Sequence, residues 1–136
     1  MLAIHDAEHE EITPDASRLI ISKLTCSLVD TTQTITILPG TLAHRAYGQT
    51  TATEQFVCNY GLNPVYRESI SQGRLKIAGI DASEEVRIVE LSAHRFFLAT
   101  LFLPQLSSTP TMPHPLIVAY LQAAQNFQAC PQRQQG

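Results

Sequence analysis

The sequence has little charge, no long apolar run and few cysteines, and each shortage removes a class of protein. Only 15% of its 136 residues are charged, the formal net charge is −3, and Lys and Arg form no cluster. Nothing therefore supports binding to nucleic acid or to a membrane. No apolar stretch approaches the roughly 18–20 residues that span a bilayer. The acidic start, MLAIHDAEHEE, is unlike a signal peptide. Three cysteines without close spacing argue against a disulfide framework, so we expect a cytoplasmic protein.

What is present predicts one mixed domain. The chain is 44% hydrophobic and long enough to bury a sizeable core. Short runs rich in β-branched residues, bounded by turn residues, predict strands. The predicted strands are LTCSLVD (24–30), TQTITIL (32–38), EQFVCNYGL (54–62), RLKIAGI (74–80), EVRIVEL (85–91) and the apolar run 96–102. The first two and the fourth and fifth are each predicted to pair as a hairpin.

Helices are predicted to cover this sheet. Asn63 and Pro64 are typical of the cap and first position of a helix, and Gly48 is typical of a helix end. The predicted helical segments are 41–48, 63–73 and the stretch from Pro115, after a proline-broken loop at 107–114; residues 1–11 are predicted as the tail of a helix or a loop leaving one. Strands with helices packed on them indicate an α+β fold.

Three segments taken in order resemble a known family. They are ILPGTLAHRAYG, then NYGLNPVY with RLKIAGIDASEEVRIVEL, then HRFFLATLFLPQLSSTPTMPHPLIVAYLQAA. They resemble the C-terminal part of the CTP synthase glutaminase domain, a class I glutamine amidotransferase. The resemblance implies a part of that α/β-derived fold, mostly antiparallel strands with covering helices, and a setting in pyrimidine metabolism. It divides a single, partial domain into 1–23 (N-terminal segment), 24–106 (sheet region with one inserted helix) and 107–130 (loop and C-terminal helix).

The family's catalytic residues are altered here. In the family, a strand ends in His-Pro-Glu, in which the histidine activates a nucleophilic cysteine and the glutamate orients the histidine. The matching residues are Leu103, Pro104 and Gln105. Leu103 cannot accept a proton, and Gln105 cannot stabilise an imidazolium. We therefore expect no catalytic residue at this place.

The family's substrate-binding and nucleophile motifs are also missing. Its Arg-His-Arg-His-Arg-Tyr strand is matched by QFVCNY, in which only Tyr60 agrees, so glutamine has no guanidinium partner. No Gly-x-Cys-x-Gly turn and no phosphate-binding glycine-rich loop occurs in these 136 residues. A ligand-binding role remains conceivable for His44, in the loop that approaches the family's glutamine site, and for Tyr60.

Cys26 and Cys58 have two interpretations. Both lie in predicted strands near the vacated active-site face, which suggests a redox pair or one reactive thiolate. Alternatively, both are small buried hydrophobic residues, because no adjacent Lys, Arg or His lowers the pKa of either thiol.

The histidines suggest little chemistry. His5 and His9 are four residues apart, with Glu8 between them, a spacing that can grip a divalent metal. Acidic terminal segments with histidines are more often solvated surface, so we expect no metal and no cofactor. His94 and His114 are interpreted as a surface position and a helix start.

Two functions from different classes follow. The first is a catalytically silent glutaminase-like domain with a binding or association role and an unknown small-molecule ligand. The second is a thiol-dependent or amidotransferase-type enzyme completed by upstream residues or a partner chain. Unpaired edges in EQFVCNYGL and LTCSLV also predict self-association, with a dimer as the expected outcome.

Overall fold

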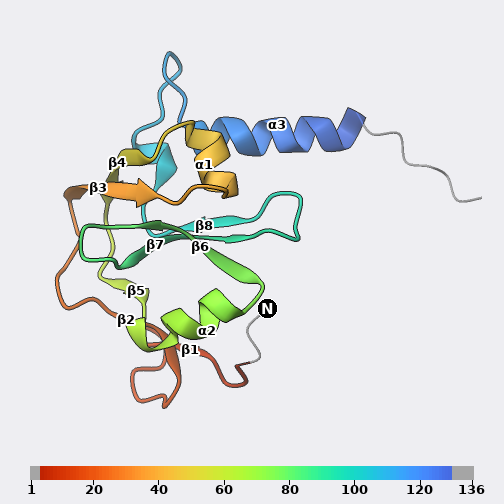
Figure 1. The fold of residues 1–136 in the computed structure, drawn as a ribbon. Helices are drawn as coiled ribbons and strands as arrows, with labels where there is room; N and C mark the ends of the chain where they lie inside the picture. The colour runs from red at the N-terminus through yellow and green to blue at the C-terminus, as the bar shows by residue number, and fades with distance from the viewer. Residues whose placement is uncertain (1–3, 130–136) are drawn as a thin grey trace, which may run out of the picture.

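The computed structural model describes residues 4–129, which form a mixed α+β fold with two sheets (Figure 1). The strands are β1 Glu8–His9, β2 Leu19–Lys23, β3 Thr31–Ile37, β4 Thr51–Phe56, β5 Tyr60–Leu62, β6 Leu75–Ile80, β7 Val86–Leu91 and β8 Leu98–Thr100. The α-helices are α1 Leu42–Tyr47, α2 Arg67–Gln72 and α3 Pro115–Ala129, and short 3₁₀ turns cover Pro64–Tyr66 and Pro104–Leu106. The predicted fold class is confirmed.

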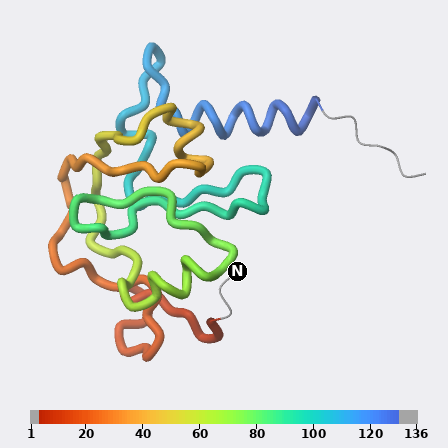
Figure 2. The backbone as a smooth tube through the Cα atoms, in the orientation of Figure 1, coloured from red at the N-terminus to blue at the C-terminus, as the bar shows by residue number. Residues whose placement is uncertain are grey.

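The larger sheet has the order β4-β3-β6-β7-β8, and every neighbouring pair in it is antiparallel. The smaller sheet has the order β1-β2-β5, in which β1 runs parallel to β2 and β5 runs antiparallel. The backbone trace shows α1 and α3 at one end of the larger sheet, with the smaller sheet and α2 at the opposite end (Figure 2).

The core lies on one face of the larger sheet, under α1 and the start of α3. Alternation along β3 buries Ile35 and Ile37 completely, and Ile88 of β7 lies in the same cluster. The Phe56 ring at the end of β4 packs edge-to-face against Phe102, with ring centroids 5.7 Å apart. This core positions the residues that follow β8.

Several local predictions are confirmed. Helix α1 begins at the Thr41 cap, whose side chain accepts the His44 N–H, and ends at Gly48 with a φ of 68°. The Asn63 side chain caps the turn that leads into α2. Strands β6 and β7 form the predicted hairpin, and α3 begins at Pro115 as expected.

The predicted hairpin of residues 24–30 and 32–38 is wrong. The strand lies earlier, at Leu19–Lys23, so strands begin before residue 24. Strand β3 pairs instead with β4 and β6. Residues 24–30 form no strand, because they lie beside the irregular segment between β4 and β5 and not beside a strand. The hydrogen bonds there run from Leu24 N–H to Asn59 O and from Leu28 N–H to Cys58 O.

For residues 1–11, of which 1–3 lie outside the described residues, the helix-tail alternative is wrong: residues 4–11 form turns, as the loop alternative predicts, with the two-residue β1 among them. Two other elements differ from the prediction. The single strand expected over 54–62 is two strands, β4 and β5, interrupted where Cys58 and Asn59 take the bonds described above. The strand expected over 96–102 has regular pairing only at Leu98–Thr100.

Candidate functional site

The segment after β8 is where the sequence places the altered catalytic residues. Leu103 precedes the 3₁₀ turn Pro104–Leu106, and 37% of its surface is exposed. Gln105 is also exposed, so neither side chain is held in a buried pocket. The segment provides a hydrocarbon and an amide, and neither group transfers protons at neutral pH.

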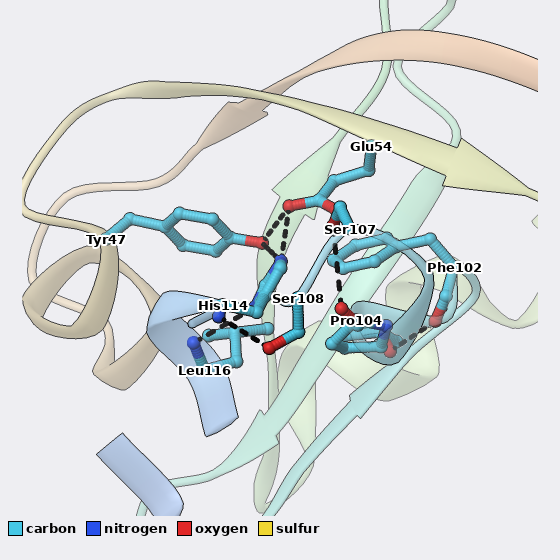
Figure 3. Close-up of polar contacts among 9 residues, drawn as sticks. Tyr47, Glu54, Phe102, Pro104, Ser107, Ser108, His114 and Leu116 are labelled. Carbon is cyan, nitrogen blue, oxygen red and sulfur yellow. Dashed lines mark hydrogen bonds and ion pairs between the residues drawn. The ribbon is translucent and has the colours of Figure 1, made fainter. Parts of the chain in front are cut away.

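A buried polar cluster lies directly behind this segment, formed by Tyr47, Glu54 and His114 (Figure 3). Glu54 Oε1 accepts a hydrogen bond from the Tyr47 hydroxyl at 2.5 Å and lies 2.9 Å from His114 Nε2. Tyr47 and His114 also approach each other, with 3.4 Å between Oη and Nε2. The Glu54 and His114 side chains are only 3% and 4% exposed. The cluster thereby joins α1, β4 and the start of α3.

Hydrogen bonding assigns the tautomer of His114. Its Nδ1 accepts the backbone N–H of Leu116 at 3.2 Å, so the ring proton is on Nε2, which donates to Glu54. Its backbone N–H donates to Ser108 Oγ at 3.0 Å, which ties the loop after β8 to the same residue. His114 therefore caps α3 and is not available as a general base.

Burial, followed by the hydrogen bond and charge of Glu54, raises the pKa of Tyr47. The phenol therefore stays protonated and continues to donate to Glu54. The second carboxylate oxygen of Glu54, Oε2, is buried and has no hydrogen-bond partner among residues 4–129. The cluster contains no nucleophile, and its arrangement suits a structural anchor for the loop.

Sequence reasoning missed this cluster. It interpreted His114 as a plain helix start, whereas the ring is buried and forms the cap. The contact between Glu54 and His114 spans 60 residues, which no local pattern reveals. The one available signal is the alternation of β4, in which every second residue, Glu54 included, faces the interior.

The two candidate cysteines are not in strands. Cys26 is exposed, which contradicts the buried interpretation, and Cys58 is half-buried between β4 and β5. The segments that contain Cys26 and Cys58 lie side by side, joined by the hydrogen bond from Leu28 N–H to Cys58 O. Within residues 4–129, no Lys, Arg or His side chain is hydrogen-bonded to either thiol.

The candidate ligand-binding residues His44 and Tyr60 lie on different elements. His44 is half-buried in α1, whereas Tyr60 is in β5 of the smaller sheet, with its ring centroid 5.4 Å from that of His9. No hydrogen bond or ring contact joins His44 to Tyr60 in the part of the chain that the structure describes. A common site for the two stays a prediction.

The N-terminal histidines make ordinary structural bonds. His9 Nδ1 accepts the Glu11 N–H, and Glu8 accepts from the Thr13 hydroxyl. Among residues 4–129, no group of three His, Cys, Asp or Glu side chains is placed to hold a metal ion. No helix in the same range is long and apolar enough to cross a membrane.

Comparison with known proteins connects this geometry to a family, although no family model matches the chain. The CTP synthase of Archaeoglobus fulgidus is 39% identical over 94 residues, which are 68% of this chain and 18% of that protein. The CTP synthase of Picosynechococcus is 31% identical over 138 residues, covering 94% of this chain and 25% of that protein. The chain thus spans a quarter or less of the length of these relatives.

The fold also matches that of a solved glutaminase domain. The glutaminase domain of Trypanosoma brucei CTP synthase, solved with bound acivicin, superimposes with a TM-score of 0.82 at 24% identity, over 89% of this chain and 51% of that domain. The chain is therefore a glutamine amidotransferase-like member of the class I family, homologous to the C-terminal part of the CTP synthase glutaminase domain.

Proposed function

We propose that this chain is a catalytically silent glutaminase-like domain that acts by binding or association. The observation that supports the proposal most strongly is Leu103-Pro104-Gln105 at the end of β8, where the family it resembles has His-Pro-Glu. Both changed side chains are exposed and lack acid–base chemistry. His114, the histidine of the buried cluster, already uses both ring nitrogens in hydrogen bonds with Glu54 and with the Leu116 N–H.

The glutamine-binding strand supports the same proposal. Its counterpart runs through the end of β4 and the break before β5, where Gln55 and Val57 are exposed. Residues 55–60 contain no arginine or histidine, so a substrate carboxylate has no bidentate partner there.

Glutamine hydrolysis by highly purified protein tests the proposal. We expect no ammonia release above buffer background, with a complete CTP synthase as the positive control. The Cys58→Ser variant is the matched negative control. Hydrolysis by the unmodified chain that disappears in Cys58→Ser would contradict catalytic silence.

A second candidate function is a thiol-dependent or amidotransferase-type enzyme completed by upstream residues or a partner chain. Two observations favour it: Cys26 is exposed beside the segment of Cys58, and this chain matches only half of the solved glutaminase domain. Labelling with a thiol reagent across pH distinguishes the candidates. Silence predicts fast labelling of the exposed Cys26 and slower labelling of the half-buried Cys58, with both rates falling steeply as the pH is lowered. Labelling of either residue that stays fast in mildly acidic buffer, as for a stabilised thiolate, would favour the enzyme.

For the association role, we propose a homodimer. Within residues 4–129, strand β4 is an edge of the larger sheet, because it pairs only with β3. The other predicted edge, residues 24–29, is not a strand and contributes no pairing surface. An unpaired edge is a template for a second copy, and a lasting interface buries about 2,000 Å² or more. Light scattering at micromolar concentration checks this, and a well-folded monomer there would exclude the dimer.

A further inference from the structure

A groove lies between α1, the turn that joins β7 to β8, and α3. Its volume is about 450 Å³, and its lining mixes apolar side chains with polar ends. Leu42, Phe96 and Val118 contribute to the apolar surface, while Gln122 and Asn126 contribute amides from α3. The groove is lined by none of the residues from Leu103 to Leu106 and by none of the buried cluster. A role for the groove therefore does not depend on whether the chain is catalytically silent.

Among residues 4–129, Arg45 of α1 and Arg95 of the β7–β8 turn are the only charged residues that line the groove. Within residues 4–129, neither guanidinium forms an ion pair, whereas Arg87 elsewhere is fully paired with Asp81. In a chain with a formal net charge of −3, this groove is a local concentration of positive charge.

The Arg95 guanidinium is held in place from one side. Its central carbon lies 3.8 Å from the centroid of the Phe127 ring on α3, a cation–π contact. Such stacking uses the face of the planar guanidinium and leaves its N–H groups, which lie in the plane, for an acceptor. The arginine therefore keeps its N–H donors available at the edge of the groove.

We propose that this groove binds a small organic anion, with a carboxylate or phosphate held by Arg45 and Arg95 and an apolar body placed against α1 and α3. Guanidinium groups match the geometry of both anions through paired hydrogen bonds. The volume lies within the range of roughly 300–1,000 Å³ that small-molecule sites occupy. The absence of any carboxylate from the lining removes the repulsion that an anion would otherwise meet.

NMR titration of the ¹⁵N-labelled full chain tests the proposal with three probes that share a phenylpropyl body: 4-phenylbutyrate, 3-phenylpropyl phosphate and the neutral 4-phenylbutan-1-ol. We expect saturable shifts of the Arg45, Arg95 and Gln122 resonances with one or both anions and much weaker binding of the alcohol. Whichever anion binds more tightly identifies the preferred head group. Arg45→Gln and Arg95→Gln should each weaken binding roughly tenfold.

Arg74→Gln is the matched control, because Arg74 is exposed and lies outside the groove; it should leave binding unchanged. Arg45→Lys keeps the charge without the paired donors and should retain part of the affinity. Equal binding of anion and alcohol, shifts located elsewhere, or affinities that no arginine variant alters would each overturn the proposal. A dispersed spectrum for each variant confirms that folding is not the cause.

Discussion

The two sheets differ in how much of the chain they bury. In the larger sheet, β3 contributes the fully buried Ile35 and Ile37, and buried charged side chains are paired, as in Arg87 with Asp81 and His114 with Glu54. In the smaller sheet, no residue of β2 is fully buried. An apolar pocket of about 240 Å³, open to one side, lies between them and is lined by Ile20 and Leu62 of the smaller sheet and by Val89 of the larger one. Stability therefore resides in the larger sheet, and the smaller one is attached by weaker packing.

The largest effect expected from this comparison comes from a buried ion pair. Arg87 donates two hydrogen bonds to Asp81 Oδ2, and both side chains are less than 10% exposed. Arg87→Met leaves a buried carboxylate without its cation and should lower the free energy of unfolding by about 3–5 kcal/mol. The same change at the exposed Arg18, beside the smaller sheet, should cost under about 0.5 kcal/mol. Urea denaturation measures both.

A double variant controls for the cause. Asp81→Asn keeps an acceptor for the Ser83 and Glu85 N–H groups, which Asp81 Oδ1 now binds. Combined with Arg87→Met, it removes both charges and should recover part of the loss. If the double variant loses as much free energy of unfolding as the two single variants together, the unpaired charge is not the reason for the loss.

Apolar truncation compares the sheets directly. Ile88 in β7 is completely buried, and Ile88→Ala should cost about 2–5 kcal/mol through lost contacts and a new cavity. Ile21 in β2 is half-buried beside the existing cavity, so Ile21→Ala should cost about half as much or less. Equal losses in urea denaturation would show that the smaller sheet is as tightly packed as the larger one.

Helix ends give a smaller contrast. Gly48, after α1, has a φ of 68°, and open space surrounds the position of an added Cβ. Gly48→Ala should therefore cost about 1–2 kcal/mol from backbone conformation alone. Gly73, after α2, has a φ of −89°, so Gly73→Ala should be neutral or should stabilise by up to about 1 kcal/mol. Thermal unfolding of the two variants checks the difference.

The smallest expected effect appears only in alkali. Because the pKa of Tyr47 is raised in the folded state, its contribution is fully present below the ordinary tyrosine pKa of about 10 and is lost as pH rises above that value. Stability should therefore fall less steeply above about pH 10 in Tyr47→Phe than in the unmodified chain. Tyr120→Phe, at an exposed position of α3, is the control and should keep the original slope. Parallel profiles for Tyr47→Phe and the unmodified chain would contradict the assignment.

Local signals predicted helix caps, a helix end and one hairpin well. The Thr41 and Asn63 caps, the turn at Gly48 and the alternation of β6 and β7 act over a few residues, so they can be read without the fold. The smaller sheet was predicted poorly. Strand β2 is half-buried along its length, so its sequence shows little alternation of apolar and polar residues. Residues 24–30 are rich in residues that favour strands, but their hydrogen bonds go to an irregular segment around Cys58.

By itself, the sequence determined what chemistry is missing: Leu103 and Gln105 lack proton-transfer groups wherever they lie. It also determined the helix that starts at Pro115, because the proline at its first position and the apolar periodicity that follows are local. Only the tertiary structure decided that Glu54 meets His114 and that Arg45 shares a groove with Arg95. Those pairs come from separate elements, and the packing of α1 and α3 on the sheet brings them together. Burial then made the first pair a fixed anchor, while the two arginines stay exposed and form no ion pair within residues 4–129.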